Sequence, residues 1–176
     1  MVGAIFFHLG LGRSRVASIG LLAGMAVCGS GQAGQTDCVQ LSADRYGLPV
    51  SVIQAVLKVE GGRVGQAVRN DNGTEDLGPM QINTVWLPHL APYGVTRQQL
   101  QNDRCINILV GSWILAGQLK IAKNMEGPVQ RRVWWGIGAY HSRTPEHNVD
   151  YALKVWQALR AAPPHRVAEV KRALTP

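Results

Sequence analysis

Apolar residues recur at helical intervals along most of this 176-residue chain. The clearest stripe follows Pro49, with spacings that place its members on one face of a helix. Its members are Val50, Ile53, Val56 and Leu57. Pro49 suits the start of this helix, because its fixed φ and missing N–H are tolerated in a first turn. Gly61 and Gly62 then end the helix.

Further stretches of the same kind predict helices over 38–46, 104–123, 129–140 and 145–160. Thr96 and Asp103 are predicted N-caps, and Asp103 starts the longest helix. The last helix begins at Pro145. Its predicted buried face consists of Val149, Ala152, Val155, Trp156 and Leu159. The stretch 79–90 predicts short helical pieces.

Residues 61–77 show no periodicity. They contain a strong turn signal at 70–73, Asn-Asp-Asn-Gly. A loop this long is uncommon in a compact domain unless it is functional. No stretch of the chain alternates apolar and polar residues in the way that predicts a strand. The expected fold class is therefore mainly α, an irregular helical bundle.

The first 33 residues predict a secretory signal peptide. Arg13 and Arg15 precede an uncharged apolar run, and the small residues that signal peptidase reads follow at 31–33. An uncleaved membrane anchor is the alternative, but the run of about 13 residues is shorter than the ~20 that span a bilayer. A lipid anchor on Cys28 is disfavoured by the large Val27. The predicted organisation is a leader over 1–33, a domain over 34–162 and a tail over 163–176.

Two cysteines, Cys38 and Cys105, remain after removal of the leader. In an exported protein they most simply form one disulfide. The chain-entropy model gives a loop of this size about 4 kcal/mol of stabilisation. Two buried free thiols are the alternative. No metal site is expected, because neither cysteine has a second cysteine or a histidine at ligand spacing.

The chain is basic. Its net charge is +7, and loss of Arg13 and Arg15 with the leader brings it to +5. An exported basic protein suits an anionic polymer or a membrane surface. Nucleic acid is not the expected partner, because the positive residues are scattered and are not interleaved with aromatic residues.

Glu60 is the first candidate for chemistry. It follows the apolar stripe directly, and 48–58 contains no other acid. Burial on such a background raises the pKa of a carboxyl group, as a general acid near neutral pH requires. A negative charge at a helix C-terminus is also mildly unfavourable, which suggests a purpose. The alternative is an ordinary solvated residue at a helix end.

Other candidate residues follow Glu60 along the chain. Asp71, Glu75 and Asp76 are either turn-forming and capping acids or the source of a second carboxylate for glycoside hydrolysis. Residues 78–83 taken alone predict a turn into a helix, with Met80 in the core. Trp134 and Trp135, and the Tyr140–His141 pair, are either core aromatics or a platform for stacking sugars. A Ser/His or Cys/His hydrolase is not expected, because no nucleophile lies in an activating context.

Taken in order, four of these elements resemble a known family. They are Glu60, Asn72-Gly73 followed by Asp76, Gly78-Pro79-Met80-Gln81-Ile82-Asn83, and Ala139-Tyr140. The set resembles the soluble lytic transglycosylase domain, a lysozyme-like fold that cleaves peptidoglycan, over about 38–156. Cys38, the Asp103-x-Cys105-x-Asn107 run and Trp113-Ile114-Leu115 are similar to a narrower branch. That branch comprises small exported transglycosylases of type IV secretion and conjugation, type III secretion and type IV pilus machines.

The resemblance implies a role for each matching residue. Glu60 would be the single catalytic acid/base, and Tyr140 would hydrogen-bond near it and keep it protonated. Met80 and Gln81 would shape the saccharide cleft. Gly78, Asn83 and His141 complete the expected substrate-binding set. The chain departs from the family in having Gly61 in place of serine after the glutamate and His141 in place of asparagine after Ala-Tyr.

The resemblance also implies a reaction, and the predicted leader implies a location. Cleavage between N-acetylmuramic acid and N-acetylglucosamine would give a 1,6-anhydro product, without a metal or cofactor. The substrate's own acetamido group would replace a second carboxylate. The expected protein is a periplasmic monomer that acts on glycan strands beside a secretion, conjugation or pilus apparatus. A hydrolytic lysozyme of the same fold and a non-catalytic peptidoglycan-binding module are the alternatives.

Overall fold

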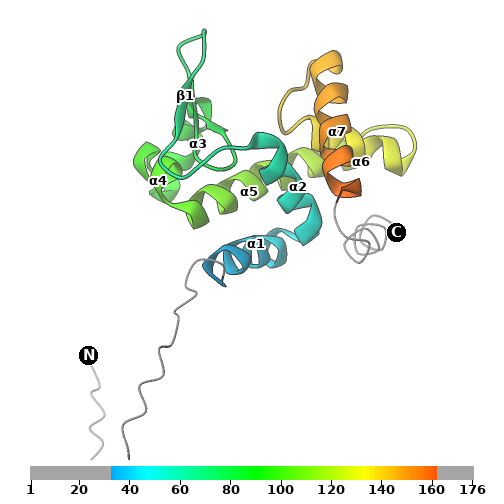
Figure 1. The fold of residues 1–176 in the computed structure, drawn as a ribbon. Helices are drawn as coiled ribbons and strands as arrows, with labels where there is room; N and C mark the ends of the chain where they lie inside the picture. Colours follow the sequence, from blue (N-terminus) through cyan, green and yellow to red (C-terminus); the bar gives the residue numbers. More distant parts are fainter. Residues whose placement is uncertain (1–32, 162–176) are drawn as a thin grey trace, which may run out of the picture.

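Helix α5 (Arg104–Lys123) is the central element of the computed structural model, which describes residues 33–161 (Figure 1). It begins where predicted, after Asp103, whose carboxylate accepts a hydrogen bond from the Ile106 N–H at 2.9 Å. Ile108 and Leu115 are completely buried on it. The helix is long and apolar enough to cross a membrane, but half of its apolar stretch is buried inside the protein, as expected of a core helix.

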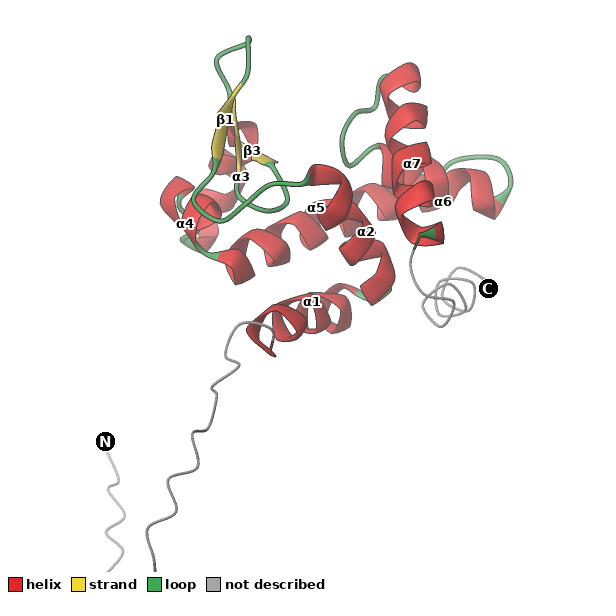
Figure 2. Ribbon diagram, in the orientation of Figure 1, coloured by secondary structure: helices red, strands yellow, loops and turns green. Residues whose placement is uncertain are grey.

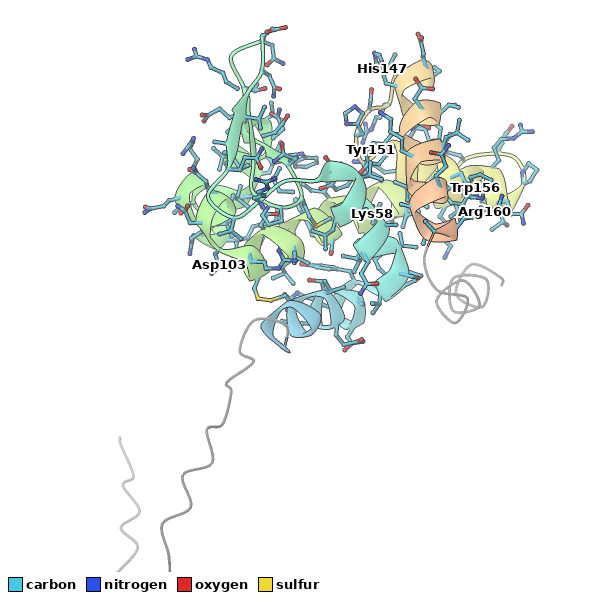
Figure 3. The ribbon with its side chains drawn as sticks, in the orientation of Figure 1. Lys58, Asp103, His147, Tyr151, Trp156 and Arg160 are labelled. Carbon is cyan, nitrogen blue, oxygen red and sulfur yellow. A yellow bond between two sulfur atoms is a disulfide. The ribbon has the colours of Figure 1, made fainter. Side chains whose placement is uncertain are left out.

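Helix α1 (Ala33–Tyr46) packs along α5. The predicted disulfide between Cys38 and Cys105 joins the two helices and is confirmed (Figure 3). Cys105 lies in the first turn of α5, so the covalent bond fixes α1 to the start of the core helix. The alternative of two free thiols is therefore wrong.

Helix α2 (Val50–Glu60) follows Pro49 as predicted and buries Val52, Ile53 and Val56 against the core. It ends at Gly61, which has φ +63° and donates its N–H to Leu57 O. Such a left-handed residue is the usual end of a helix, and glycine adopts it without strain. The predicted end of α2 at Glu60 is thus confirmed.

Three short strands lie between α2 and α5, and the expectation of no strands was wrong (Figure 2). Strands β1 (Ala67–Arg69), β2 (Glu75–Leu77) and β3 (Ile82–Asn83) form an antiparallel sheet in the order β1-β2-β3. Val68 pairs with Asp76, and Leu77 pairs with Ile82. Two or three residues are too few to show an alternating pattern. The predicted turn at 70–73 is the hairpin loop between β1 and β2.

Short helices complete this side of the fold. They are the 3₁₀ helices η1 (Thr84–Trp86) and η2 (Ala91–Tyr93) and the α-helices α3 (Leu87–Leu90) and α4 (Arg97–Asn102). The prediction of short helical pieces holds for 84–90, whereas Ile82 and Asn83 belong to β3. Thr96 caps α4 as predicted, in a capping box with Gln99.

Helices α6 (Val129–Gly138) and α7 (Pro145–Arg160) pack on each other and close the other side. Helix α6 ends two residues earlier than predicted. On α7, Ala152, Val155 and Leu159 are buried as expected, but Val149 is 56% and Trp156 41% exposed. The buried face of α7 instead includes Asn148 and Tyr151. The fold class, mainly α with one disulfide, is confirmed. The predicted leader, apart from Ala33, and the predicted tail lie outside the described residues.

Candidate active site

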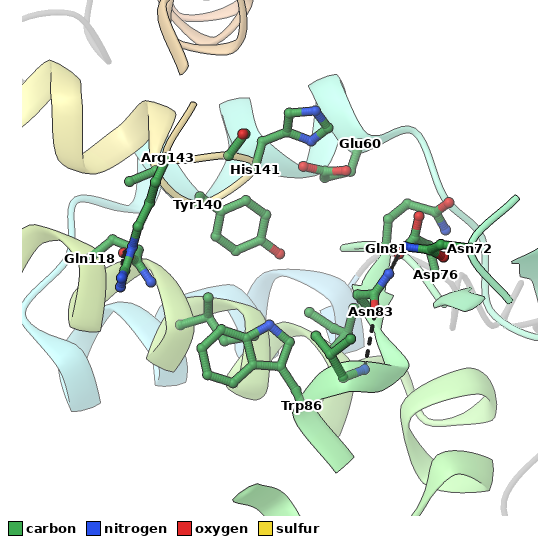
Figure 4. Close-up of a pocket in the computed structure, with 15 residues that line it drawn as sticks. Glu60, Asn72, Asp76, Gln81, Asn83, Trp86, Gln118, Tyr140, His141 and Arg143 are labelled. Atoms are coloured by element: carbon green, nitrogen blue, oxygen red, sulfur yellow. Dashed lines mark hydrogen bonds between the residues drawn. The ribbon is translucent and has the colours of Figure 1, made fainter. Parts of the chain in front are cut away.

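A cleft of about 700 Å³ lies between the end of α2, the small sheet and the loop that joins α6 to α7 (Figure 4). Trp86, Ile114 and Tyr140 contribute its apolar walls. Its polar lining comes mainly from Glu60, Asp76, Gln81, Asn83, His141 and Arg143. The cleft therefore collects residues that are up to 83 positions apart in sequence, from Glu60 to Arg143.

Two consecutive glycines bring Glu60 to this cleft. Gly61 turns the chain out of α2. Gly62 then passes so close to the 78–81 turn that a Cβ atom there would lie 2.1 Å from Gly78 O and 2.5 Å from Gln81 Nε2. Only glycine fits such a contact with the backbone. The Glu60 carboxylate is thus held beside residues 78–81, which belong to the same set of ordered motifs.

The Glu60 carboxyl group has a pKa raised from 4.5 to about 7. Burial is the main cause, because it penalises the charged form. The Tyr151 hydroxyl donates a 2.5 Å hydrogen bond to Glu60 Oε1, which opposes the rise. The negative charge of Asp76 raises this pKa further, and Lys154 lowers it. A glutamic acid with this pKa can both give and take a proton near neutral pH.

The 78–81 turn is held by a buried side chain of α5. Asn107, which is fully buried, donates from Nδ2 to Leu77 O and to Leu100 O, both at 2.8 Å. Its Oδ1 accepts the Met80 N–H at 2.8 Å. Gly78 has φ +67°, and a Cβ atom there would lie 2.5 Å from Asn107 Nδ2. The amide of Asn107 therefore ties the turn, through Leu77 and Met80, to the end of α4, through Leu100.

The turn contributes only part of the predicted substrate-binding set to the cleft. Met80 is 0% exposed and packs against Gly111, and neither Met80 nor Gly78 lines the cleft. Both residues are instead buried inside the turn. Gln81, at φ +47°, does line the cleft, and its Nε2 donates to Gly78 O at 2.8 Å. Asn83 lines it too, and caps η1 by accepting the Val85 N–H.

Of the three other candidate acids, only Asp76 reaches the cleft. Its two carboxylate oxygens accept from Asn70 Nδ2 at 3.0 Å and from Asn83 Nδ2 at 2.8 Å. Glu75 forms an ion pair with Arg97 at 2.8 Å instead. Asp71 is exposed in the loop between β1 and β2. Asp76 is thus the one remaining candidate for a second carboxylate among the described residues.

Residues 37–158 match the family model described as the transglycosylase SLT domain. The chain belongs to the SLT transglycosylase family. It is 30% identical to the invasion protein IagB of Salmonella typhimurium over 129 residues, which cover 70% of this chain and 76% of that protein. It is 29% identical to the protein IpgF of Shigella flexneri over 122 residues, 69% of this chain and 75% of that protein.

A further relative is the X polypeptide of Escherichia coli K12. It is 26% identical over 149 residues, which cover 79% of this chain and 83% of that protein. Membership of the SLT family confirms the resemblance and the lysozyme-like fold expected from the ordered motifs.

The SLT domain places a tyrosine on Glu60, but it is not the expected one. The resemblance assigned a hydrogen bond near Glu60 to Tyr140, whereas the Tyr140 hydroxyl donates to Met80 O at 2.8 Å. Tyr151 of α7 contacts Glu60 instead. Sequence reasoning missed Tyr151. The available signal was its position one residue before Ala152 in a helix face of buried residues, where a tyrosine hydroxyl needs a partner.

Aromatic rings connect the two tyrosines to His141. The imidazole of His141 stacks on the Tyr151 ring with centroids 5.0 Å apart and planes at 5°. The Tyr140 and Tyr151 rings are 6.1 Å apart. Burial, followed by the charges of Lys154 and His147, lowers the pKa of His141. His141 thus lines the cleft of the SLT domain and stacks on the tyrosine that contacts Glu60.

The predicted tryptophan pair does not belong to this cleft. Trp134 and Trp135 line a separate hollow between α6 and α7. The tryptophan that lines the Glu60 cleft is Trp86, which packs edge-on against Trp113 at 5.6 Å. Among residues 33–161, no cluster of His, Cys, Asp and Glu has a geometry suited to a metal ion.

Proposed function

We propose that this protein cleaves the β-1,4 bond between N-acetylmuramic acid and N-acetylglucosamine in peptidoglycan and releases 1,6-anhydro-muropeptides. Membership of the SLT family supports the substrate class and the transglycosylase type of reaction. The observation that carries the proposal is Glu60, a carboxyl group with a pKa of about 7 in a polar cleft.

In the first step, protonated Glu60 donates its proton to the glycosidic oxygen as the bond to the anomeric carbon breaks. The substrate's acetamido oxygen stabilises the positive charge that develops on that carbon. Tyr151 holds Glu60 Oε1 throughout and also supports the carboxylate formed by proton transfer.

In the second step, ionised Glu60 takes the proton of the muramoyl 6-hydroxyl group. That oxygen then forms the new bond to the anomeric carbon and closes the anhydro ring. One residue gives and regains one proton, so no water is consumed. The raised pKa of Glu60 suits this double role, because the two protonation states are close in free energy at neutral pH.

A hydrolytic lysozyme reaction is the second candidate, and Asp76 is the observation that favours it. Its carboxylate shares the cleft with Glu60 and raises the Glu60 pKa. However, both oxygens of Asp76 already accept hydrogen bonds from Asn70 and Asn83. These hydrogen bonds support a role for Asp76 in holding the cleft wall, rather than in positioning a water molecule.

Mass spectrometry of digested peptidoglycan tests the proposal. The expected products are muropeptides that end in anhydro-muramic acid. Reducing ends alone would overturn the transglycosylase reaction and favour the hydrolase. A Glu60→Gln variant that still binds peptidoglycan and retains full biological function would instead indicate a non-catalytic binding module.

We further propose that the protein is exported to the periplasm and opens the wall for a secretion, conjugation or pilus apparatus. The predicted leader supports export. The similarity to a Salmonella protein named for invasion supports a link to such an apparatus. Fractionation of cells that produce the full chain tests the location. Recovery in the cytoplasmic fraction would overturn it.

A further inference from the structure

The two ends of the Glu60 cleft carry different chemistry. Figure 4 shows Gln118 and Arg143 on one side of the Tyr140 ring, and Gln81, Asn83 and Asp76 on the other. Glu60 lies toward the second end. Arg143 is the only lysine or arginine among the described residues that line the cleft. One end is thus acidic and rich in amides, and the other is cationic.

The arginine is oriented by a buried amide. Arg143 donates from Nε and Nη2 to a single atom, Gln118 Oε1, at 3.2 and 3.1 Å. Gln118 is only 6% exposed, because it lies on α5 in the base of the cleft. A guanidinium group has five N–H donors in a fixed plane. The contact with Gln118 therefore fixes the orientation of the guanidinium group and leaves its other N–H groups available to a second acceptor.

The described residues supply no second acceptor for the Arg143 guanidinium group. Within residues 33–161, no carboxylate lies within ion-pair distance of Arg143. An oriented arginine that faces a cleft and lacks an acidic partner is well suited to bind a carboxylate of a ligand, since guanidinium and carboxylate groups match in geometry.

We propose that Arg143 and Gln118 form a subsite for a carboxylate of the peptide stem attached to muramoyl residues. This inference rests on the proposed action on peptidoglycan. In a strand that carries stems, the N-acetylglucosamine units are uncharged and each muramoyl lactyl carboxyl group is bound as an amide, so the free carboxylates are those of the stems. A cation at one end of the cleft therefore favours a strand whose stem carboxylates are free over one in which they are amidated. It also favours one direction of the strand across Glu60.

Binding measurements test the subsite without relying on turnover. We would use calorimetry on proteins that carry Glu60→Gln, so that the ligand survives. The two ligands are soluble glycan fragments with stems and the same fragments after the stem carboxylates have been converted to amides. We expect fragments with free stem carboxylates to bind more tightly to the Glu60→Gln protein than the amidated fragments do. Adding Arg143→Met should lower this preference about tenfold, the loss typical of one hydrogen bond to a charged group.

Two further variants complete the design. Arg143→Lys keeps the positive charge but loses the planar set of N–H donors, and we expect it to retain part of the preference. Arg131→Met is the matched control, because Arg131 lies on α6 and does not line the Glu60 cleft. It should keep the full preference. The preference should also weaken as salt rises. The subsite would be overturned if the ratio of the affinities for the two ligands were the same in the Arg143→Met and Arg131→Met proteins.

The outcomes separate this inference from the proposed reaction. If Arg143→Met removes the preference but wild-type protein releases no anhydro products, the subsite stands and the reaction fails. If anhydro products appear but the preference does not depend on Arg143, the reaction stands and the subsite fails. Thermal melting of each variant checks folding. Arg143 is exposed, so we expect no loss of the folded state.

Discussion

The SLT domain has a polar cleft around Glu60 and an apolar groove between α6 and α7, and they differ in chemistry more than in size. The Glu60 cleft measures about 700 Å³ and the groove between α6 and α7 about 530 Å³. The cleft contains carboxylates, amides, an imidazole and a guanidinium group. The groove is lined by Trp134, Trp135, Val149, Ala152, Leu153 and Trp156, with Arg131 and Asn148 as its polar members. An apolar hollow of this kind has few groups that can orient a sugar or move a proton.

Helix α7 separates the two hollows. Figure 3 shows Tyr151 on the side that faces α2, and Trp156 and Arg160 on the opposite side. Asn148 joins the two regions, because its Nδ2 donates to Trp135 O on the groove side and to Ser142 O in the cleft loop, both at 3.0 Å. The comparison shows that the catalytic candidate is identified by a buried acid with a hydrogen-bond partner. Exposed tryptophans and open volume do not identify it.

The largest expected effect is on glycan cleavage by Glu60→Gln. Glutamine cannot give or take the proton, so the rate should fall by at least about 100-fold, as expected for loss of a general acid. The release of muropeptides from purified peptidoglycan measures it. Leu153→Ala in the groove is the control and should retain activity, because Leu153 is 50% exposed and remote from the cleft lining. Similar losses in both variants would mean that the two hollows are not functionally distinct.

The second expected effect is on stability. A Glu60 pKa of about 7 in the folded protein lies above its value of 4.5 in the unfolded chain. The folded state therefore binds the proton more tightly, and its free energy of unfolding decreases as pH rises from about 4.5 to 7. This corresponds to up to about 3 kcal/mol. Glu60→Gln should remove that loss, so its melting temperature should exceed that of wild type at pH 8 and match it at pH 4. A lower melting temperature at pH 8 would contradict an unfavourable carboxylate.

The main cleft residue and the fold that positions it were predictable from local signals. Pro49, the apolar stripe and Gly61 specify where α2 starts and stops, so Glu60 was found as a lone acid at a helix end. Asp103 and the two cysteines likewise specify α5 and its link to α1. These signals act over a few residues, or through a covalent bond, and need no knowledge of packing.

Other features depend on packing between distant segments. Tyr151 contacts Glu60 from 91 positions away, and nothing near Tyr151 in sequence indicates that partner. The role of Asn107 is similar, because it holds the 78–81 turn from α5. Val149 and Trp156 were wrongly expected in the core, because helical spacing cannot distinguish a buried face from an apolar groove. The strands were missed because each has only two or three residues.

The third expected effect is a shift in the pH dependence of cleavage in Tyr151→Phe. Glu60 must be protonated to act as an acid, so kcat/KM should fall above about pH 7 in wild type. The Tyr151 hydroxyl stabilises the carboxylate and lowers the Glu60 pKa. Its removal should move the alkaline limb to higher pH and reduce the rate about tenfold through loss of one charge-assisted hydrogen bond. If the variant were slower but the alkaline limb of its pH profile were unshifted, Tyr151 would contribute only through packing.

The smallest expected effect comes from the groove itself. Trp156→Ala removes an indole that is 41% exposed and stacked under the Arg160 guanidinium, with 4.7 Å from its central carbon to the ring centroid. We expect cleavage to change by less than about twofold, since most surface substitutions cost under 0.5 kcal/mol. Trp86→Ala is the matched variant, because it removes an indole from the Glu60 cleft. It should lower kcat/KM about tenfold through lost apolar contact with the glycan. Equal effects of the two substitutions on kcat/KM would place the glycan across both hollows and remove the distinction between them.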